Sequence, residues 1–184
     1  MTEYTIYSDL HMGAPHEIKA ELEFREGSVF LGDIFDLKNC HKRDLESLTR
    51  MRHDAIEECS RTGGIYVTGN HSLEDNHLYD TRDGVLFMHG DLVQANPEKA
   101  LTWRTRPAMG KSGLRWKSLG MFYNLMPKSI PLFDMYFRRA SNIAYENCCH
   151  TVVMGHFHPK KMVEKHYNGK RIIVMPRGRH KIDV

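Results

Sequence analysis

The chain has 184 residues, of which 41% are hydrophobic and 27% are charged, and its formal net charge is +3. This length suits one domain with a substantial core, and the composition is that of a soluble globular protein, which excludes disordered and fibrous chains. No apolar run is long enough to span a bilayer, and the first residues lack the basic and apolar regions of a secretory signal. We therefore expect residues 1–184 to form a single cytoplasmic domain.

The cysteines show no metal-binding or disulfide pattern. Cys40 and Cys59 stand alone, Cys148 and Cys149 are adjacent, and no C-x-x-C pair is present. Adjacent cysteines rarely bridge each other, so reduced thiols are the better interpretation. Zinc fingers and disulfide scaffolds are thereby excluded.

Five short apolar segments are predicted strands, and each ends in a cluster of Gly, Asp, His or Asn. They are residues 4–8, 28–31, 65–68, 85–88 and 151–154. A helix is expected over 42–59, since apolar residues recur there at helical spacing and Gly63-Gly64 follows. A hairpin is expected from 162–167 and 171–175, with Asn168-Gly169 as its turn. The stretch from 13 to 27 is too short for a full helix between the first two strands.

The segment from about 96 to 147 differs from the rest of the chain. Residues 101–140 hold eight Lys or Arg and one acid, a local charge of +7, which leaves −4 for the remainder. Proline and glycine interrupt it, and it is predicted to be a helical insert instead of part of a sheet. Such a charge calls for an anionic partner or for solvated helix faces.

The residues at the strand ends are those that bind divalent metal ions. They are Asp9, His11, Asp33, Asn70, His89, His156 and His158. Carboxylate, imidazole and amide oxygen without thiolate favour manganese, iron, zinc or nickel. Seven ligands are too many for one catalytic ion, but they suit two ions that share a bridging carboxylate. In each of the pairs Asp9/His11 and His156/His158 the two residues are two positions apart, so in extended chain their side chains point the same way.

Five motifs in order extend this pattern across most of the chain. They are Asp9-Leu10-His11, Gly32-Asp33-Ile34-Phe35-Asp36, Gly69-Asn70-His71, His89-Gly90-Asp91 and Gly155-His156-Phe157-His158. As D-x-H, G-D-x-x-D, G-N-H, H-G-D and G-H-x-H, they resemble the calcineurin-like metallophosphoesterase family. The resemblance implies an α/β fold of four layers, in which a β-sandwich is flanked by helices and the site lies along one edge.

The resemblance also implies a role for each residue. One ion, manganese as first choice, would be held by Asp9, His11, Asp33 and His158, and a second by Asp33, Asn70, His89 and His156. Asp33, Asn70 and His71 would form the catalytic group, in which His71 faces the phosphate and stabilises its charge or protonates the leaving group. Asp36 would orient a ligand through a hydrogen bond.

This sequence departs from the family at the residue after His71. The family usually has an acid there, which would orient the imidazole and raise its pKa, whereas this chain has Ser72. Glu74 and Asp75 are the candidates to take that role.

The partner of the insert remains open between three interpretations. Aromatic side chains alternate with cations, and Arg104, Arg106, Lys111 and Arg115 are the candidate substrate-binding residues. A plain helical cap, a cap that lies on an anionic lipid or membrane surface, and a nucleic-acid groove all fit this pattern. Within the family, a basic insert after H-G-D is similar to that of the UDP-2,3-diacylglucosamine pyrophosphohydrolases, which are peripheral enzymes of lipid A synthesis. Those enzymes are longer and commonly carry Arg in place of His71.

The expected function is hydrolysis of a phosphomonoester, phosphodiester or pyrophosphate bond by a hydroxide that bridges two metal ions. The alternatives are a lipid A-type pyrophosphohydrolase, a nuclease or cyclic-nucleotide phosphodiesterase, and a metal-binding scaffold without catalysis.

Overall fold

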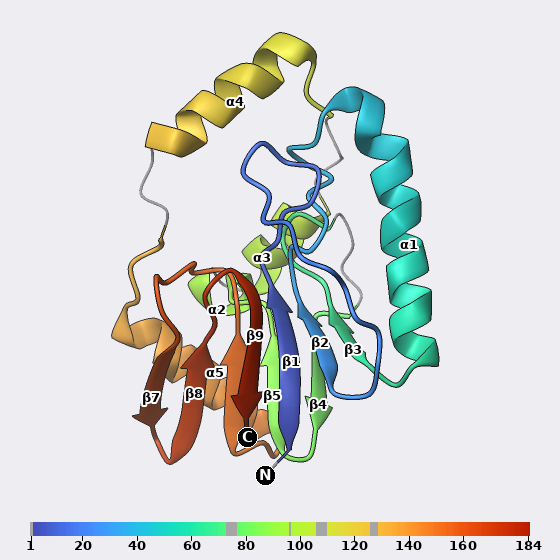
Figure 1. Ribbon diagram of the computed structural model, residues 1–184. Coiled ribbons are helices and arrows are strands. Elements are labelled where there is room, and N and C mark those ends of the chain that lie inside the picture. The colour runs from blue at the N-terminus through green and yellow to red at the C-terminus, as the bar shows by residue number, and fades with distance from the viewer. Residues whose placement is uncertain (1, 73–76, 96, 106–109, 126–128) are drawn as a thin grey trace.

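A computed structural model of the chain describes residues 2–72, 77–95, 97–105, 110–125 and 129–184 (Figure 1). Its strands are β1 (Glu3–Ser8), β2 (Ser28–Leu31), β3 (Ile65–Val67), β4 (Tyr79–Arg82), β5 (Val85–Met88), β6 (Thr151–Met154), β7 (Val163–Tyr167), β8 (Lys170–Val174) and β9 (Gly178–Asp183). Its α-helices are α1 (Leu45–Arg61), which a 3-10 turn at Lys42–Asp44 precedes, α2 (Asp91–Gln94), α3 (Pro97–Arg104), α4 (Gly113–Leu125) and α5 (Asp134–Glu146).

The strands form two mixed sheets. The first has the order β3-β2-β1-β9, and the second has the order β4-β5-β6-β8-β7. In the first, β1, β2 and β3 are parallel and β9 is antiparallel to β1. In the second, β5, β6 and β8 are parallel, while β4 and β7 pair antiparallel at the edges. The five strands predicted from the sequence are all parallel strands, whose two buried faces explain their unbroken apolar character.

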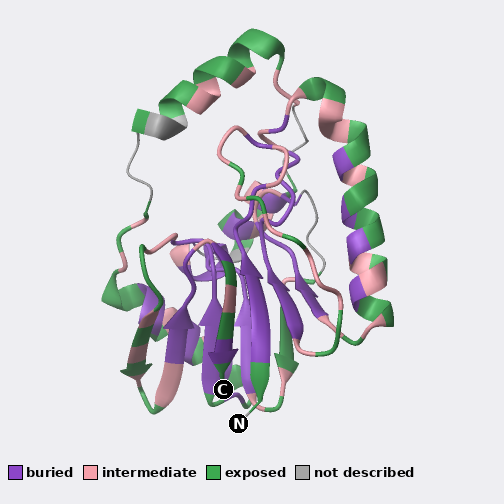
Figure 2. Ribbon diagram, in the orientation of Figure 1, coloured by how far each residue is buried: buried purple, intermediate pink, exposed green. Residues whose placement is uncertain are grey.

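Four layers result, with a buried apolar core at each junction. Between the two sheets, Tyr4 and Phe87 meet edge to face with ring centroids 5.0 Å apart, within a core that both sheets build. On the outer face of the first sheet, α1 packs against Phe30 and Tyr66. On the outer face of the second sheet, Phe137 and its helix α5 pack against β5, β6 and β8. Figure 2 shows buried residues along the strands of both sheets. The predicted four-layer α/β fold is thus confirmed.

The local predictions hold with small shifts at the element ends. The predicted helix over 42–59 is the 3-10 turn followed by α1, which extends to Arg61. The predicted hairpin forms from β7 and β8, and both turn residues, Asn168 and Gly169, have positive φ as a two-residue turn requires. Residues 13–27 contain no helix, as expected. Strands β4 and β9 were not predicted.

The insert at about 96–147 forms α3 to α5, directly after α2, and only part of it joins the core. α2 and α5 contact each other and contribute to the core outside the second sheet. α4 instead lies above the carboxyl ends of the strands, apart from both sheets, and most of its residues are exposed (Figures 1 and 2). Within the described part of the chain, every helix lacks the length and apolar content that a membrane crossing needs.

Candidate metal centre

The predicted site residues follow the carboxyl ends of the parallel strands, at one edge of the sandwich. Asp9 follows β1, Asp33 follows β2, Asn70 follows β3, His89 follows β5 and His156 follows β6. Because parallel strands end at the same edge of a sheet, residues far apart in the sequence meet there.

The backbone at this edge adopts a conformation that L-residues avoid. Asp9, His11, Asp33, His156 and His158 have φ between 47° and 77°. For a residue other than glycine, the left-handed region costs roughly 1–2 kcal/mol, and it persists only where the surroundings enforce it. Strained backbone of this kind clusters at functional sites, so this edge of the sandwich is a candidate functional site.

A first cluster consists of Asp9, His11 and His158, whose ligand atoms all lie within 4.8 Å of one another. Asp9 Oδ1 is 3.1 Å from His158 Nε2. Burial opposes the ionisation of Asp9, but His158 and His89 beside it hold its pKa well below the usual range. This cluster therefore offers one carboxylate and two imidazoles.

A second cluster consists of Asp33, His89 and His156, all of them buried. His89 Nε2 lies 3.1 Å from His156 Nδ1, 3.2 Å from Asn70 Oδ1 and 3.4 Å from Asp33 Oδ2. A single N–H of His89 cannot point at three acceptors at once. Ligands about 2.1 Å from one ion lie roughly 3.0 Å apart in octahedral and about 3.4 Å apart in tetrahedral coordination. The observed separations match those of atoms that surround one cation.

The Asp33 carboxylate lies between the two clusters. Its Oδ2 is 3.4 Å from His89 Nε2 and 4.0 Å from His11 Nε2. Burial opposes the ionisation of Asp33, but His71, His89 and His11 hold its pKa well below its usual value. An ionised carboxylate in this position can bind a cation on either side.

His11 gives the clearest indication that these donor atoms fit a metal ion. His11 Nδ1 donates to Asp36 Oδ2 at 2.9 Å, which leaves a lone pair on Nε2. That Nε2 is buried and has no hydrogen-bond partner among the described atoms. A buried acceptor without a donor is costly unless a cation occupies the space in front of it. The residues present therefore fit divalent ions.

The Asp36 carboxylate contacts the His71 ring, which has Ser72 and not an acid directly after it. Its Oδ1 lies 2.7 Å from His71 Nδ1 and accepts from the backbone N–H of Asn39 at 2.8 Å. Its Oδ2 accepts from His11 Nδ1. Burial alone would lower the pKa of His71, but Asp36 and Asp33 raise it to about 9. Ser72 is buried, and its Oγ accepts from the Gly69 N–H at 3.0 Å.

The two other candidates for that role, Glu74 and Asp75, lie outside the described residues. Within the described part of the chain, Asp36 Oδ1 and Asn39 Nδ2 lie 2.7 and 3.1 Å from His71 Nδ1. The spacing of the G-D-x-x-D motif was the signal for this contact, although the sequence by itself did not say which imidazole Asp36 would meet.

Two supporting residues could not be predicted from the sequence. Gln94, at the end of α2, has its Oε1 2.6 Å from His156 Nε2, so Nδ1 of that ring faces the second cluster. Arg177 donates from Nε to the Asp9 backbone oxygen at 2.9 Å and from Nη2 to the His16 oxygen at 2.7 Å. Neither residue lies in a motif, because their roles depend on contacts between distant segments.

Glycine is required where the chain crosses the Asp9 carboxylate. A Cβ at Gly155 would lie 2.6 Å from Asp9 Oδ2, the oxygen that accepts the His156 N–H at 2.9 Å. Ser8 Oγ also donates to this oxygen. Oδ2 is therefore occupied by two donors, and Oδ1 is left to face His158.

The insert residues predicted to bind substrate have different positions. Arg104 is fully buried and forms an ion pair with Asp91, so its guanidinium does not face solvent, which differs from the expectation of a free phosphate-binding cation. Lys111 is half-buried, and its backbone pairs with Cys40 and Lys42. Arg115 is exposed on α4, and Arg106 lies outside the described residues.

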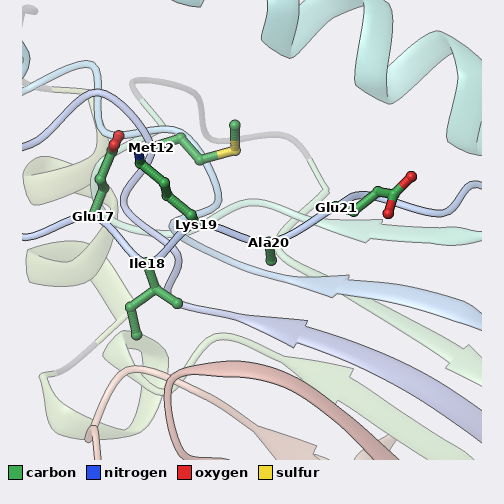
Figure 3. A pocket seen from close by; sticks show the side chains of 6 residues that line it. All are labelled: Met12, Glu17, Ile18, Lys19, Ala20 and Glu21. Carbon is green, nitrogen blue, oxygen red and sulfur yellow. The ribbon is translucent and has the colours of Figure 1, made fainter.

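A pocket of about 410 Å³ lies next to the metal-site loop. It is lined by Met12, Glu17, Ile18, Lys19, Ala20 and Glu21, whose side chains Figure 3 shows. Met12 follows His11 directly, but none of the lining residues belongs to either cluster. The site is therefore identified from its donor atoms and not from this pocket.

No family model and no curated protein matches this sequence. Solved structures give weak similarities. A cold-active protein-tyrosine phosphatase of a psychrophilic Shewanella species is 17% identical, with 94% of this chain and 70% of that chain covered and a TM-score of 0.43. A predicted phosphoesterase from Streptococcus pneumoniae is 14% identical, with 100% of this chain and 85% of that chain covered and a TM-score of 0.41. Similarities at this level carry no argument about function. The proposed function is therefore based on the residues of the site.

Proposed function

We propose that this protein is a phosphoesterase that uses two divalent metal ions, manganese as first choice, to hydrolyse a phosphomonoester, phosphodiester or pyrophosphate bond. The observation that carries the proposal is the Asp33 carboxylate between two donor clusters, 3.4 Å from His89 Nε2 and 4.0 Å from His11 Nε2. Phosphatases and nucleases use two ions about 3.5–4 Å apart, and a shared carboxylate is suited to that arrangement.

In this proposal each metal ion is held by its own set of side chains, and one carboxylate is shared. Asp9, His11 and His158 would hold one ion, His89, His156 and Asn70 would hold the other, and Asp33 would bind both. Bound there, the ions would activate water for attack on phosphorus and neutralise the charge on the phosphate oxygens. The fixed rings and carboxylates keep the donor atoms in place, so little reorganisation is needed when substrate binds.

His71 is proposed to protonate the leaving group. Its side chain is 17% exposed, and Asp36 holds its Nδ1 at 2.7 Å. In the metal-free protein the pKa of His71 is raised to about 9, so its Nε2 carries a proton at neutral pH, and this role requires that Asp36 keeps the ring protonated when the ions are bound. That proton can pass to the leaving oxygen, after which Asp36 and Asp33 favour its replacement from solvent.

The assay of this proposal uses bis-p-nitrophenyl phosphate, p-nitrophenyl phosphate and pyrophosphate, with protein stripped of metal and then supplied with Mn²⁺. We expect turnover that depends on Mn²⁺ and is abolished by chelator. Two bound ions without turnover of any of these substrates would instead indicate a metal-binding scaffold. The bond type that is cleaved fastest assigns the monoesterase, diesterase or pyrophosphatase activity.

The partner of the insert remains a prediction. α4 exposes Leu114, Met121 and Leu125, each at least 69% accessible, and Arg115 lies on the same helix. An anionic lipid surface suits exposed apolar side chains beside cations, and a nucleic acid would suit the cations alone. The substrate panel therefore includes single-stranded DNA and a UDP-sugar lipid. Cleavage of DNA alone would contradict the lipid interpretation.

Binding of metal is expected to release a proton from the second cluster. Burial alone would lower the pKa of His89, but Asp33 and Asp9 raise it to about 9, so Nε2 is protonated at pH 7.5 in the metal-free protein. An ion must displace that proton before it can bind Nε2. Below pH 9, Mn²⁺ affinity should therefore increase by up to about tenfold for each pH unit.

Calorimetric titration of Mn²⁺ in buffers with different ionisation enthalpies measures this proton. His166, which is 73% exposed and lies on β7, provides the matched control, and His166→Gln should release the same number of protons as the wild type. Metal binding without proton release at pH 7.5 would contradict the protonation state assigned to His89.

A further inference from the structure

The segment that carries the G-N-H motif is held by three basic side chains: Arg52 of α1, Arg104 of α3, and Lys38 from the turn between β2 and α1. Each donates to a backbone carbonyl, and the carbonyls alternate along the segment: Arg104 Nη1 to Thr68, Lys38 Nζ to Asn70, and Arg52 Nη1 to Ser72. Since these cations point at carbonyl groups, they serve the loop and are not aimed at solvent. The loop they hold delivers Asn70 to the second cluster.

Arg104 contacts a carboxylate as well as the backbone of the loop. It is fully buried, and its Nε and Nη2 donate to the two carboxylate oxygens of Asp91 at 2.9 and 2.7 Å. Its Nη1 donates to the Thr68 backbone oxygen at 2.7 Å and to the Thr68 hydroxyl at 2.8 Å. Because the guanidinium is planar and binds both Asp91 and Thr68, it defines the position of these two residues relative to each other.

The two partners of Arg104 belong to different sheets. Thr68 follows β3 of the first sheet, two residues before Asn70, and Asp91 follows β5 of the second sheet, two residues after His89. Asn70 Oδ1 and His89 Nε2 are 3.2 Å apart in the second cluster. Arg104 therefore joins the two sheets at the point where each contributes a donor atom to that cluster.

Through α2, the same ion pair is also linked to His156 of the second cluster. Asp91 is the first residue of α2, and Gln94 at the end of α2 contacts His156 Nε2 at 2.6 Å. On the other side, Lys38 Nζ donates to the Trp103 backbone oxygen, which fixes the end of α3 that carries Arg104. The first part of the insert is thereby attached to the scaffold of the second cluster.

A buried ion pair of this kind is better explained by geometry than by stability. Because Arg and Asp lose their hydration on burial, such a pair adds little net stability compared with apolar residues. What it provides is a single relative arrangement of the groups it joins. No contact of Arg104 reaches the donor atoms of the first cluster among the described residues, so its influence is expected on the second cluster only.

We propose that Arg104 is a positioning residue for the second ion, because its bidentate contact with Asp91 and its contacts with Thr68 set the distance between His89 and Asn70. This inference rests on the proposed two-ion function. It assigns the start of the insert to the metal centre instead of to substrate binding.

The experiment compares wild type, Arg104→Met and Arg104→Lys, each stripped of metal and titrated with Zn²⁺. The imidazole NMR signals of His158 and His156 report the first and the second cluster separately. In Arg104→Met we expect the His156 midpoint to move to about 10–100-fold higher Zn²⁺, and the His158 midpoint to move less than about threefold. Arg104→Lys retains the charge without the fork, so it should recover part of the affinity.

Two further variants control for folding and for charge. Arg104→Met combined with Asp91→Leu leaves no unpaired buried charge, so it tests the same prediction if Arg104→Met alone does not fold. Arg138 is exposed on α5 within the insert, and Arg138→Met should titrate like the wild type at both clusters. Thermal unfolding of each metal-free variant verifies that it is folded.

The outcomes separate this inference from the proposed function. Wild-type protein that binds fewer than two ions overturns the two-ion function and this inference with it. Wild-type protein that binds two ions, while folded Arg104→Met binds both unchanged or both equally weakly, overturns the positioning role and leaves the function standing. Selective weakening at His156 supports it.

Discussion

Asp33→Asn is expected to lower Mn²⁺-dependent turnover at least about 10³-fold, a larger loss than any other single substitution should cause. Asn has the shape of Asp but only one acceptor oxygen and no charge. Asp33 Oδ2 lies within 4.0 Å of both His11 Nε2 and His89 Nε2, so one substitution removes an anionic donor from both clusters. The loss should therefore exceed that caused by replacing a residue of one cluster.

Steady-state kinetics with bis-p-nitrophenyl phosphate measure the loss of turnover, and calorimetry with Mn²⁺ shows whether both affinities fall. Asp54→Asn is the matched control, because Asp54 is exposed on α1 away from the strand ends. Turnover by Asp33→Asn within tenfold of the wild type, or the loss of only one ion, would be incompatible with a carboxylate that serves both clusters.

Asp36→Asn is expected to lower turnover by about 10²-fold through the proton on His71. Asp36 is fully buried, and its carboxylate orients His71 Nδ1 at 2.7 Å and His11 Nδ1 at 2.9 Å. Since Asp36 is the strongest cause that raises the pKa of His71 to about 9, its removal should let that pKa fall. The alkaline limit of the pH–rate profile should then move to lower pH.

The same substitution has a consequence for stability in the metal-free protein. A raised pKa of His71 means that its protonation stabilises the fold fully below pH 6.5, and that this contribution is lost as the pH rises through about 9. In Asp36→Asn, the free energy of unfolding should lose about 1–3 kcal/mol near neutral pH and depend less on pH in this range.

Urea unfolding from pH 6 to 9.5, together with an NMR titration of the His71 ring, measures both effects. Asp80→Asn on the exposed strand β4 is the control and should follow the wild type. A His71 ring that still titrates near pH 9 in Asp36→Asn would contradict the assignment of Asp36 as the residue that orients and charges it.

The sequence determined the parallel strands and the chemistry at their ends. Segments such as residues 85–88 are buried on both faces, so their apolar character is unbroken and visible without a structure. The Asp and His residues that follow such segments show, without a structure, which kinds of donor atom stand at the strand ends. Strand β9 shows the opposite case, because its buried positions at Gly178 and Ile182 are separated by polar residues that carry no strand signal.

The face of α1 illustrates a limit of periodicity. The helical spacing of apolar residues includes Met51, which is 45% exposed, whereas the neighbouring Arg52 is buried and donates to the Ser72 backbone oxygen. A pattern of apolar residues predicts which face is buried. It cannot predict that a cation on that face will donate a hydrogen bond to a backbone carbonyl of a distant segment. The same limit explains why Arg104 was expected to face substrate.

What the sequence determined is thus the set of local elements and the kinds of donor atom, because both depend on neighbouring residues. Only the tertiary structure decided which donors meet: that Asp33 lies between two clusters, that Asp36 serves His71 where an adjacent acid is lacking, and that Arg104 pairs with Asp91. The last two of these contacts join residues 35 and 13 positions apart. The position of Asp33 beside His89 depends on the packing of two sheets, which no local pattern encodes.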